Sequence, residues 1–409
     1  MKAYLVGGAV RDQLLNFPVR ERDWVVVGET PEQILDQGFK SVGKDFPVFL
    51  HPETHDEYAL ARTERKTAPG YKGFVVHADP DVTLEQDLIR RDLTINAMAM
   101  LPDGQVIDPY GGQADIRGKL LRHISPAFSE DPVRILRVAR FAARYAHLGF
   151  SIAPETKNLM QGMVNNGEID SLVPERVWAE THKALTEQTP SAFFTSLKEC
   201  GALACIFPEI QQLFGVPQPE RYHPEIDTGA HCLLSLEQAT LLTSSPVVRF
   251  AVLTHDLGKG VTPKEKWPSH RGHETEGLPI LKSLCQRLRV PNHFAKLAAQ
   301  VMEYHTHCHR IFELRPATLV DTLSAIGAFK PESNLSNFVL ACEADAKGRT
   351  GLEKNEYPQA NYCLSAQQAG LSVDTSEIMQ RNLYGPEIGQ AIRELRIKAV
   401  KSLQKTVTL

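Results

Sequence analysis

Short apolar runs near the start of the chain give way to helical repeats further along. Residues 3–8 and 23–28 are brief apolar runs closed by glycine, which is typical of buried strands. Residues 9–15, between them, have the apolar spacing of a short helix. Comparable strand-like runs follow at 46–50, 57–62, 95–101 and 105–108. The pattern therefore predicts an α/β head with a mixed sheet, which we place at residues 1–125.

From about residue 131 the apolar positions recur at helical spacing. Pro132 stands near the start of the first such stretch, where proline is tolerated because its missing N–H has no helical partner to lose. Further helical stretches fit residues 174–188, 191–203, 228–243, 246–257, 277–288, 292–305, 316–326 and 332–347. The expected all-α parts are a neck and body, a second domain and a tail, at residues 126–222, 228–329 and 330–409.

The composition fits this division, because 409 residues exceed what one ordinary core organises. A hydrophobic content of 42% and a charged content of 23% are typical of a soluble globular protein. No apolar run approaches the roughly 18–20 residues that span a bilayer, so we expect no membrane partner. The seven cysteines form no Cys-x-x-Cys pair, which argues against a disulfide framework or a thiolate zinc site and favours a reducing, cytoplasmic compartment.

The charge is distributed unevenly. A net charge of −4 argues against wholesale coating of nucleic acid, which depends on clustered Lys and Arg. Residues 115–144 nevertheless hold seven basic side chains against three acidic ones. A local basic segment of this kind suits contact with a nucleic acid, although a solvated helix face has the same composition.

Two carboxylates and a glycine turn are the first candidate chemistry. Glu21 and Asp23 are two residues apart at the start of a predicted strand, so their side chains point to the same side. Paired carboxylates suit Mg²⁺, which can assist transfer to a hydroxyl and the departure of pyrophosphate. Gly7 and Gly8 stand where a strand turns into a helix, which leaves backbone N–H groups free to meet a triphosphate. Together these features predict metal-assisted phosphate chemistry without a Walker A loop.

Four motifs in residues 1–145 resemble those of class II CCA-adding tRNA nucleotidyltransferases and the related bacterial poly(A) polymerases. They are GGAVRD at 7–12, Glu-x-Asp at 21–23, RRDLTINA at 90–97 and Glu-Asp-x-x-Arg at 130–134. The family pattern has Asp-x-Asp where this chain has Glu21 first. Glutamate keeps the charge and oxygens but adds a methylene, so we expect the metal to be retained and its spacing to shift slightly.

The resemblance assigns roles to residues around the glycine turn. It implies that Gly8, Arg11 and Arg91 handle the phosphates and sugar of the nucleotide. It places Asp92 near the ribose, where an acidic acceptor can select for hydroxyls. The alternative for residues 90–92 is a surface ion-pair cluster, which contributes little stability.

Asp131 and Arg134 are three apart on a predicted helix, hence neighbours on one face. Cytosine and adenine both present an amine donor beside a ring-nitrogen acceptor, which a carboxylate and a guanidinium complement. Uracil and guanine present the opposite pattern, so the pair would select C and A, as the family resemblance also implies. Arg137 and Arg140 continue the stripe and would contact phosphate or position the helix. An ion pair within the helix is the alternative for Asp131 and Arg134.

A second cluster of candidate ligands lies in the helical part. His255 and Asp256 follow an apolar helical run, and His231 precedes them on another helix. The order His231, His255-Asp256 and Asp321 resembles the HD phosphohydrolase superfamily over residues 228–329, with Asp345 as the alternative to Asp321. His270, His273 and His305 are further candidates, whereas His307 and His309 are expected to face solvent or RNA. Mixed imidazole and carboxylate ligands suit Ni²⁺, Co²⁺, Mn²⁺ or Mg²⁺.

The two resemblances imply an enzyme with two activities. The head is expected to add C, C and A to the 3′ end of tRNA from CTP and ATP, with Mg²⁺ and without a nucleic-acid template. The HD domain is expected to act as a phosphatase or 2′,3′-cyclic phosphodiesterase. The expected catalytic residues are Glu21, Asp23, His255 and Asp256.

Other interpretations stay open at this stage. A poly(A) polymerase has the same head, and an RNA-binding protein on a degenerate transferase fold would need no paired metal carboxylates. A chain in which only the HD site works is a third alternative. The partners we expect are tRNA, ATP and CTP, and the sequence leaves a homodimer open.

Overall fold

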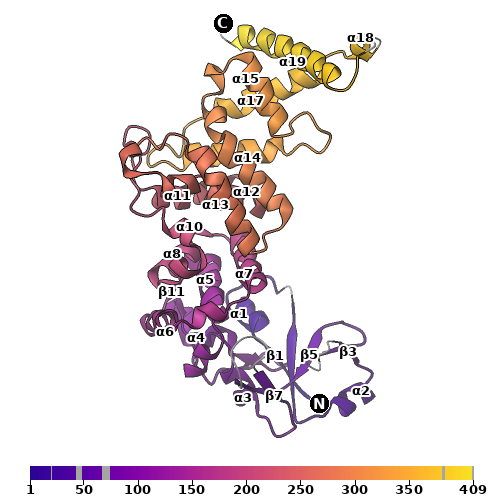
Figure 1. Ribbon diagram of the computed structural model, residues 1–409. Helices are drawn as coiled ribbons and strands as arrows, with labels where there is room; N and C mark the ends of the chain where they lie inside the picture. The colour runs from indigo at the N-terminus through magenta and orange to yellow at the C-terminus, as the bar shows by residue number, and fades with distance from the viewer. Residues whose placement is uncertain (20, 43–47, 67–73, 380–382, 408–409) are drawn as a thin grey trace. The chain divides into compact units, whose positions relative to one another are not determined.

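The computed structural model describes residues 1–409 except 20, 43–47, 67–73, 380–382 and 408–409. The chain divides into two compact units, Met1–Cys205 and Ile206–Leu409 (Figure 1). The first unit contains an α/β head and a set of helices behind it, and the second is built from helices. This is the predicted fold class.

A seven-stranded mixed sheet forms the head, in the order β3-β4-β5-β2-β1-β8-β9. Strand β1 lies antiparallel to β2 and β8, whereas β2 and β5 are parallel. The strands are β1 (Lys2–Val6), β2 (Asp23–Val27), β3 (Lys40–Val42), β4 (Val48–Leu50), β5 (Glu57–Leu60), β8 (Ala99–Met100) and β9 (Val106–Ile107). A separate hairpin pairs β6 (Thr63–Lys66) with β7 (Phe74–His77).

Two strand predictions need adjustment, and other strands were not predicted. Residues 46 and 47 of the predicted strand 46–50 lie outside the described residues. The strand predicted over 95–101 is present only at Ala99–Met100, because residues 94–96 form a 3-10 turn, η1 (Thr94–Asn96). Strands β3, β6 and β7 were not predicted, since β3 and β6 are largely polar and all three have at most four residues.

Helices cover both faces of the sheet because its side chains alternate. Val6 and Val25 face Leu84 and Leu88 of α3. On the opposite face, Leu5 packs with the first turn of α1, and Val26 packs with Ile34 of α2. The head helices are α1 (Gly8–Leu14), α2 (Pro31–Asp36), α3 (Leu84–Ile89) and α4 (Gly112–Gly118).

Helix α5 is the centre of the helical part of the first unit. Its buried side includes Ile135, Leu136, Val138 and Ala139, and it packs against α7 and α8. The helices of this part are α5 (Val133–Tyr145), α6 (Pro154–Asn165), α7 (Pro174–Thr186), α8 (Ser191–Glu199) and α9 (Ala202–Ile206).

The second unit is a helical bundle in which α16 packs against α11, α12 and α14. The expected boundary at residue 330 therefore falls inside the bundle. Its helices are α10 (Pro208–Gln211), α11 (Thr228–Leu242), α12 (Pro246–Thr254), α13 (His273–Arg287), α14 (Asn292–His309), α15 (Pro316–Ala325), α16 (Leu335–Lys347), α17 (Pro358–Leu371), α18 (Ser376–Met379) and α19 (Pro386–Val407). Among the described helices, none is both long and apolar enough to cross a membrane.

Candidate functional site

The glycine turn of the head lies directly beyond the carboxylate pair. The antiparallel register places Val6 opposite Asp23, so the turn that follows Val6 begins at the end of the strand pair where Asp23 lies. Gly7 has a φ of 69°, and a Cβ there would stand 2.8 Å from Nη1 of Arg91. Only glycine therefore permits both this backbone conformation and the close approach of the guanidinium.

Asp23 is exposed at the start of β2, and Glu21 is exposed two residues before the strand. Partial burial raises the pKa of Asp23, the Arg91 cation opposes this, and the Glu21 carboxylate adds to it. A divalent cation relieves such repulsion between neighbouring carboxylates. The pair thus fits a metal ion whose remaining ligands come from a substrate or water.

Arg91 is held beside the turn by Asp87, a residue that the sequence analysis did not identify. Asp87 is fully buried and accepts from Nη2 of Arg91 at 3.1 Å and from Nη2 of Arg90 at 2.7 Å. The two arginines lower the pKa of Asp87 against the effect of its burial. Residues 90–92 are therefore anchored in the protein rather than forming a surface cluster.

Arg11 and Asp92 belong to one buried network. Arg11 donates through Nη1 to Asn96 at 2.5 Å and through Nη2 to Asp12 at 2.7 Å. Asp92 accepts from the Asn96 side chain at 2.9 Å and from Nε of Arg137 at 2.7 Å. Despite its burial, the pKa of Asp92 falls to about 2 because of Arg137 and these hydrogen bonds. The network ties α1 to α5 through the loop after α3.

Arg140 is also engaged within the protein. It is buried, donates through Nε to Glu180 of α7 at 2.7 Å, and lies with its guanidinium 4.4 Å from the ring centroid of Phe141. Of the two expected roles, positioning of the helix agrees better with these contacts than phosphate binding.

Asp131 is not on the helix that carries Arg134, which corrects the predicted placement. Helix α5 begins at Val133, and Asp131 has an extended backbone before it. Its carboxylate accepts from both terminal nitrogens of Arg176 on α7, at 3.2 and 2.9 Å. Arg134 donates to the backbone carbonyls of Ala127 at 2.8 Å and Arg90 at 2.6 Å. Arg176 was missed because it lies 45 residues from Asp131 along the chain.

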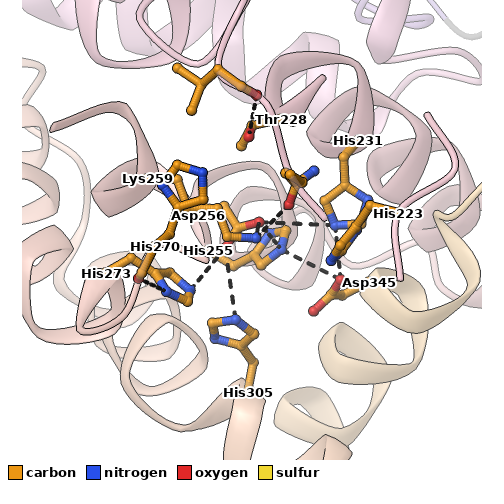
Figure 2. A network of polar contacts seen from close by, with 12 residues as sticks. His223, Thr228, His231, His255, Asp256, Lys259, His270, His273, His305 and Asp345 are labelled. Atoms are coloured by element: carbon orange, nitrogen blue, oxygen red, sulfur yellow. Dashed lines mark hydrogen bonds and ion pairs between the residues drawn. The ribbon is translucent and has the colours of Figure 1, made fainter. Parts of the chain in front are cut away.

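The second unit gathers imidazoles and carboxylates from four helices and the connection after α12 (Figure 2). His231 Nε2 lies 3.0 Å from Asp345 Oδ1, and His255 Nε2 lies 3.2 Å from Asp256 Oδ2 and 3.5 Å from Asp345 Oδ1. His305 Nε2 lies 3.8 Å from Asp256 Oδ1. All five side chains are buried.

Three of the imidazoles have the same tautomer. His255, His273 and His305 each direct Nδ1 at a backbone carbonyl, at 2.7, 3.0 and 3.0 Å. Because a carbonyl only accepts, each Nδ1 carries a proton, so the neutral form of each ring turns the lone pair of Nε2 toward the carboxylates. Asp256 Oδ1 and His273 Nε2 are buried without a hydrogen-bond partner among the described residues. Acceptors that face acceptors in this way fit a divalent metal ion.

The negative charge of Asp256 and Asp345 favours a cation beside it, either a metal ion or a second proton on His255. Burial lowers the pKa of His255, but Asp256 and Asp345 outweigh it and raise that pKa to about 10. The nearby cations in turn lower the pKa of both carboxyls despite their burial. His231, His255 and Asp256 place ligand atoms within 4.8 Å of one another, as do His255, His305 and Asp345.

Asp321 is not a member of this cluster, which corrects the predicted ligand set. It is an exposed residue that accepts from Nε and Nη2 of Arg393 at 2.6 and 2.7 Å. Asp345, named as the alternative, takes the fourth position because α16 buries it against α11, α12 and α14.

Two further histidines differ from expectation. His309 donates from Nε2 to Asp345 Oδ2 at 2.7 Å and does not face only solvent. His270 has both ring nitrogens engaged, with Thr262 and with the carbonyl of Pro217 at 2.8 Å. His270 therefore holds a loop in place and has no nitrogen left for a metal.

Comparison with known families matches three consecutive segments. Residues 3–122 match the Poly A polymerase head domain, residues 149–214 the probable RNA and SrmB-binding site of polymerase A, and residues 228–332 the HD domain. Asp345 lies beyond the last of these matches, although its side chain belongs to the cluster.

Relatives match the whole chain. It is 64% identical over 405 residues to the multifunctional CCA protein of Methylococcus capsulatus, covering 99% of this chain and 95% of that one. It is 60% identical to the multifunctional CCA protein of Teredinibacter turnerae, covering 100% of this chain and 99% of that one.

Solved structures share the fold at lower identity. A Thermotoga maritima CCA-adding enzyme complexed with tRNA has a TM-score of 0.62 at 21% identity, covering 98% of this chain and 87% of that one. The Bacillus stearothermophilus CCA-adding enzyme in complex with CTP has a TM-score of 0.65 at 22% identity, covering 98% and 89%.

Proposed function

The chain belongs to the family of multifunctional CCA proteins, and on this premise we propose that its head adds C, C and A to the 3′ end of tRNA from CTP and ATP. The observation that carries the proposal is the glycine turn beside Asp23, with Arg91 against it. This arrangement brings backbone N–H groups, a guanidinium and metal-binding carboxylates to one end of the sheet.

Glu21 and Asp23 would hold Mg²⁺, which when bound neutralises phosphate charge and assists pyrophosphate departure. Gly8 and Arg91 orient the triphosphate, and the buried partner Asp87 keeps Arg91 from swinging away. Arg11 uses three of its five N–H groups on Asn96 and Asp12, so two would be left to donate to the nucleotide.

Asp131 and Arg134 are proposed to read the base. A carboxylate offers about four acceptor positions, and Asp131 receives donors from the Val133 backbone and from Arg176. One position is then left for the exocyclic amine of cytosine or adenine. Arg176 would fix the direction of that carboxylate, so it is a positioning residue in this proposal.

The HD cluster is proposed to act as a phosphatase or 2′,3′-cyclic phosphodiesterase. His231, His255, Asp256 and Asp345 would hold Ni²⁺, Co²⁺, Mn²⁺ or Mg²⁺, which supplies Lewis acidity toward a phosphoester. The backbone carbonyls that accept from Nδ1 keep the rings of His255 and His305 aimed at the metal position.

Incorporation by the full chain tests the transferase proposal. tRNAs lacking one, two or three terminal nucleotides are incubated with CTP and ATP, separately and together. We expect CTP to be added to the tRNAs that lack two or three terminal nucleotides. ATP alone should be added only to the tRNA that lacks one nucleotide and ends in CC. Addition of ATP alone to every tRNA identifies a poly(A) polymerase instead.

We also propose that the protein works in the cytoplasm. All seven cysteines are free thiols, and six of them are buried. This supports a reducing compartment, in which thiols persist. Cell fractionation with an antibody to the chain tests the location.

A further inference from the structure

Gln218 lies in the loop before α11 and has an amide nitrogen without a partner. The residue is 2% exposed, and its Oε1 accepts from Nζ of Lys259 at 2.5 Å. Because an ammonium only donates, the amide oxygen must face Lys259 and the NH₂ group must face the other way. That nitrogen is buried with no hydrogen-bond partner in the described part of the chain. A buried donor left unpaired is costly, so a ligand that accepts from it gains affinity.

The backbone around Gln218 is fixed on both sides. Its N–H donates to the carbonyl of Ile226 at 2.7 Å. The carbonyl of Val216 accepts from the Thr228 hydroxyl at 2.9 Å, and that of Pro217 is held by His270 at 2.8 Å. The backbone at Gln218 therefore has a defined position, and turning the side-chain amide away would break its contact with Lys259.

Gln218 is joined to the HD cluster through Lys259. Nζ of Lys259 donates to Asp256 Oδ2 at 2.6 Å as well as to Gln218 (Figure 2 shows Lys259 and Asp256). An ammonium has three N–H groups, and two are used in these contacts. The third, together with the amide hydrogens of Gln218, makes a group of donors beside the carboxylates and imidazoles. A group made only of donors is complementary to an oxyanion.

We propose that Gln218 is a substrate-contacting residue of the HD site, whose Nε2–H donates to a non-bridging oxygen of a phosphoester bound at the cluster. The inference rests on the proposed phosphohydrolase function and adds to it a residue from outside the matched HD segment, which begins at residue 228. Lys259 would contact a phosphoryl oxygen with its third hydrogen. Gln218 would then bind phosphate directly as well as hold Lys259.

Binding of inorganic phosphate to the metal-loaded full chain measures this contact without relying on turnover. Gln218→Met keeps the length of the side chain but removes the amide, and Gln218→Glu keeps an acceptor for Lys259 but removes the donor. We expect both variants to weaken phosphate binding by roughly tenfold or more, while the dissociation constant of Mn²⁺ for Gln218→Met stays within about twofold of wild type. Gln300→Met is the matched control. The amide of Gln300 lies away from the cluster and donates to the backbone carbonyl of Ile326 at 2.8 Å.

Three results overturn the inference, and a fourth separates it from the proposed phosphohydrolase function. Wild-type phosphate affinity in either variant shows that the amide donor is not used. A parallel loss of Mn²⁺ affinity in Gln218→Met shows that Gln218 acts only through Lys259 and Asp256. If wild type binds phosphate through Gln218 but hydrolyses no phosphoester, the inference holds and the proposed phosphohydrolase function fails. If metal-loaded wild type binds no phosphate, the inference fails whatever the hydrolysis assay gives.

Discussion

The two candidate metal sites differ in how much of the coordination the protein supplies. In the head, Glu21 and Asp23 are exposed, with the Arg91 guanidinium and the glycine turn nearby. In the second unit, imidazoles and two carboxylates are buried together, with lone pairs turned inward. A site that carries few protein ligands depends on its substrate to complete the shell, whereas a buried set of ligands binds metal alone. The comparison predicts an open transferase site and a preformed hydrolase site in one chain.

The largest effect should come from removing either ligand set. Glu21→Ala with Asp23→Ala should lower CTP and ATP incorporation by on the order of a thousandfold or more and leave phosphohydrolysis unchanged. His255→Ala with Asp256→Ala should lower phosphohydrolysis by a similar factor and leave CTP and ATP incorporation unchanged. Both activities are measured on each full-length variant. Loss of both activities in either variant contradicts two separable sites.

The choice of Asp345 over Asp321 can be tested next. Asp345→Asn should weaken Mn²⁺ or Ni²⁺ binding by roughly 10- to 100-fold, because it removes a carboxylate oxygen from beside His231 and His255. Asp321→Asn serves as the control, since that side chain is exposed and paired with Arg393. Calorimetric titration distinguishes them, and a larger loss in the Asp321 variant would restore the sequence-based ligand set.

Chelation should affect the second unit more than the head. A divalent cation present at about a hundredfold its dissociation constant stabilises a preformed site by about 2.7 kcal/mol. We expect EDTA to lower the unfolding midpoint of the helical unit and to leave the head transition in place. His255→Ala with Asp256→Ala should abolish the EDTA response; a response that persists in that variant places the metal elsewhere.

The buried carboxylate of the head should show a structural effect of similar size. The pKa of Asp92 is about 2 in the folded chain against an ordinary 3.8, so its ion pair stabilises the fold above pH 3.8 and the effect is lost as the pH falls through about 2. Asp92→Asn should therefore cost about 2 kcal/mol at neutral pH. Urea unfolding should show that the difference in the free energy of unfolding between Asp92→Asn and wild type shrinks as the pH falls from 7 to 2. Asp36→Asn, at an exposed position, is the control.

Much of this arrangement could be predicted from sequence because it is local. The glycine turn, the paired carboxylates and the adjacent His255-Asp256 are each contained within a few residues, and the helices behind them follow from apolar spacing. The HD and transferase assignments agree with the family matches. The prediction of a strand over residues 95–101 was wrong at its start, because apolar content alone does not distinguish the short turn η1 from a strand.

The contacts that could not be predicted join distant parts of the chain. Asp345 and Asp321 both lie on helices, and only packing of α16 into the bundle decides which one is buried. The sequence predicts Asp131 on a helix because Pro132 stands near the start of the helical spacing, whereas helix α5 begins one residue after this proline. Asp87 gave no signal because an acidic residue among helical polar positions normally faces solvent; burial against two arginines is a tertiary property.

Divalent-metal titration of the full chain with and without CTP tests the difference between the two sites most directly. Without nucleotide, tight Mn²⁺ binding should be present in wild type and in Glu21→Ala/Asp23→Ala, and absent in His255→Ala/Asp256→Ala. With CTP, the His255→Ala/Asp256→Ala chain should gain a site that Glu21→Ala/Asp23→Ala lacks. Tight nucleotide-free binding that disappears with Glu21 and Asp23 would contradict the account.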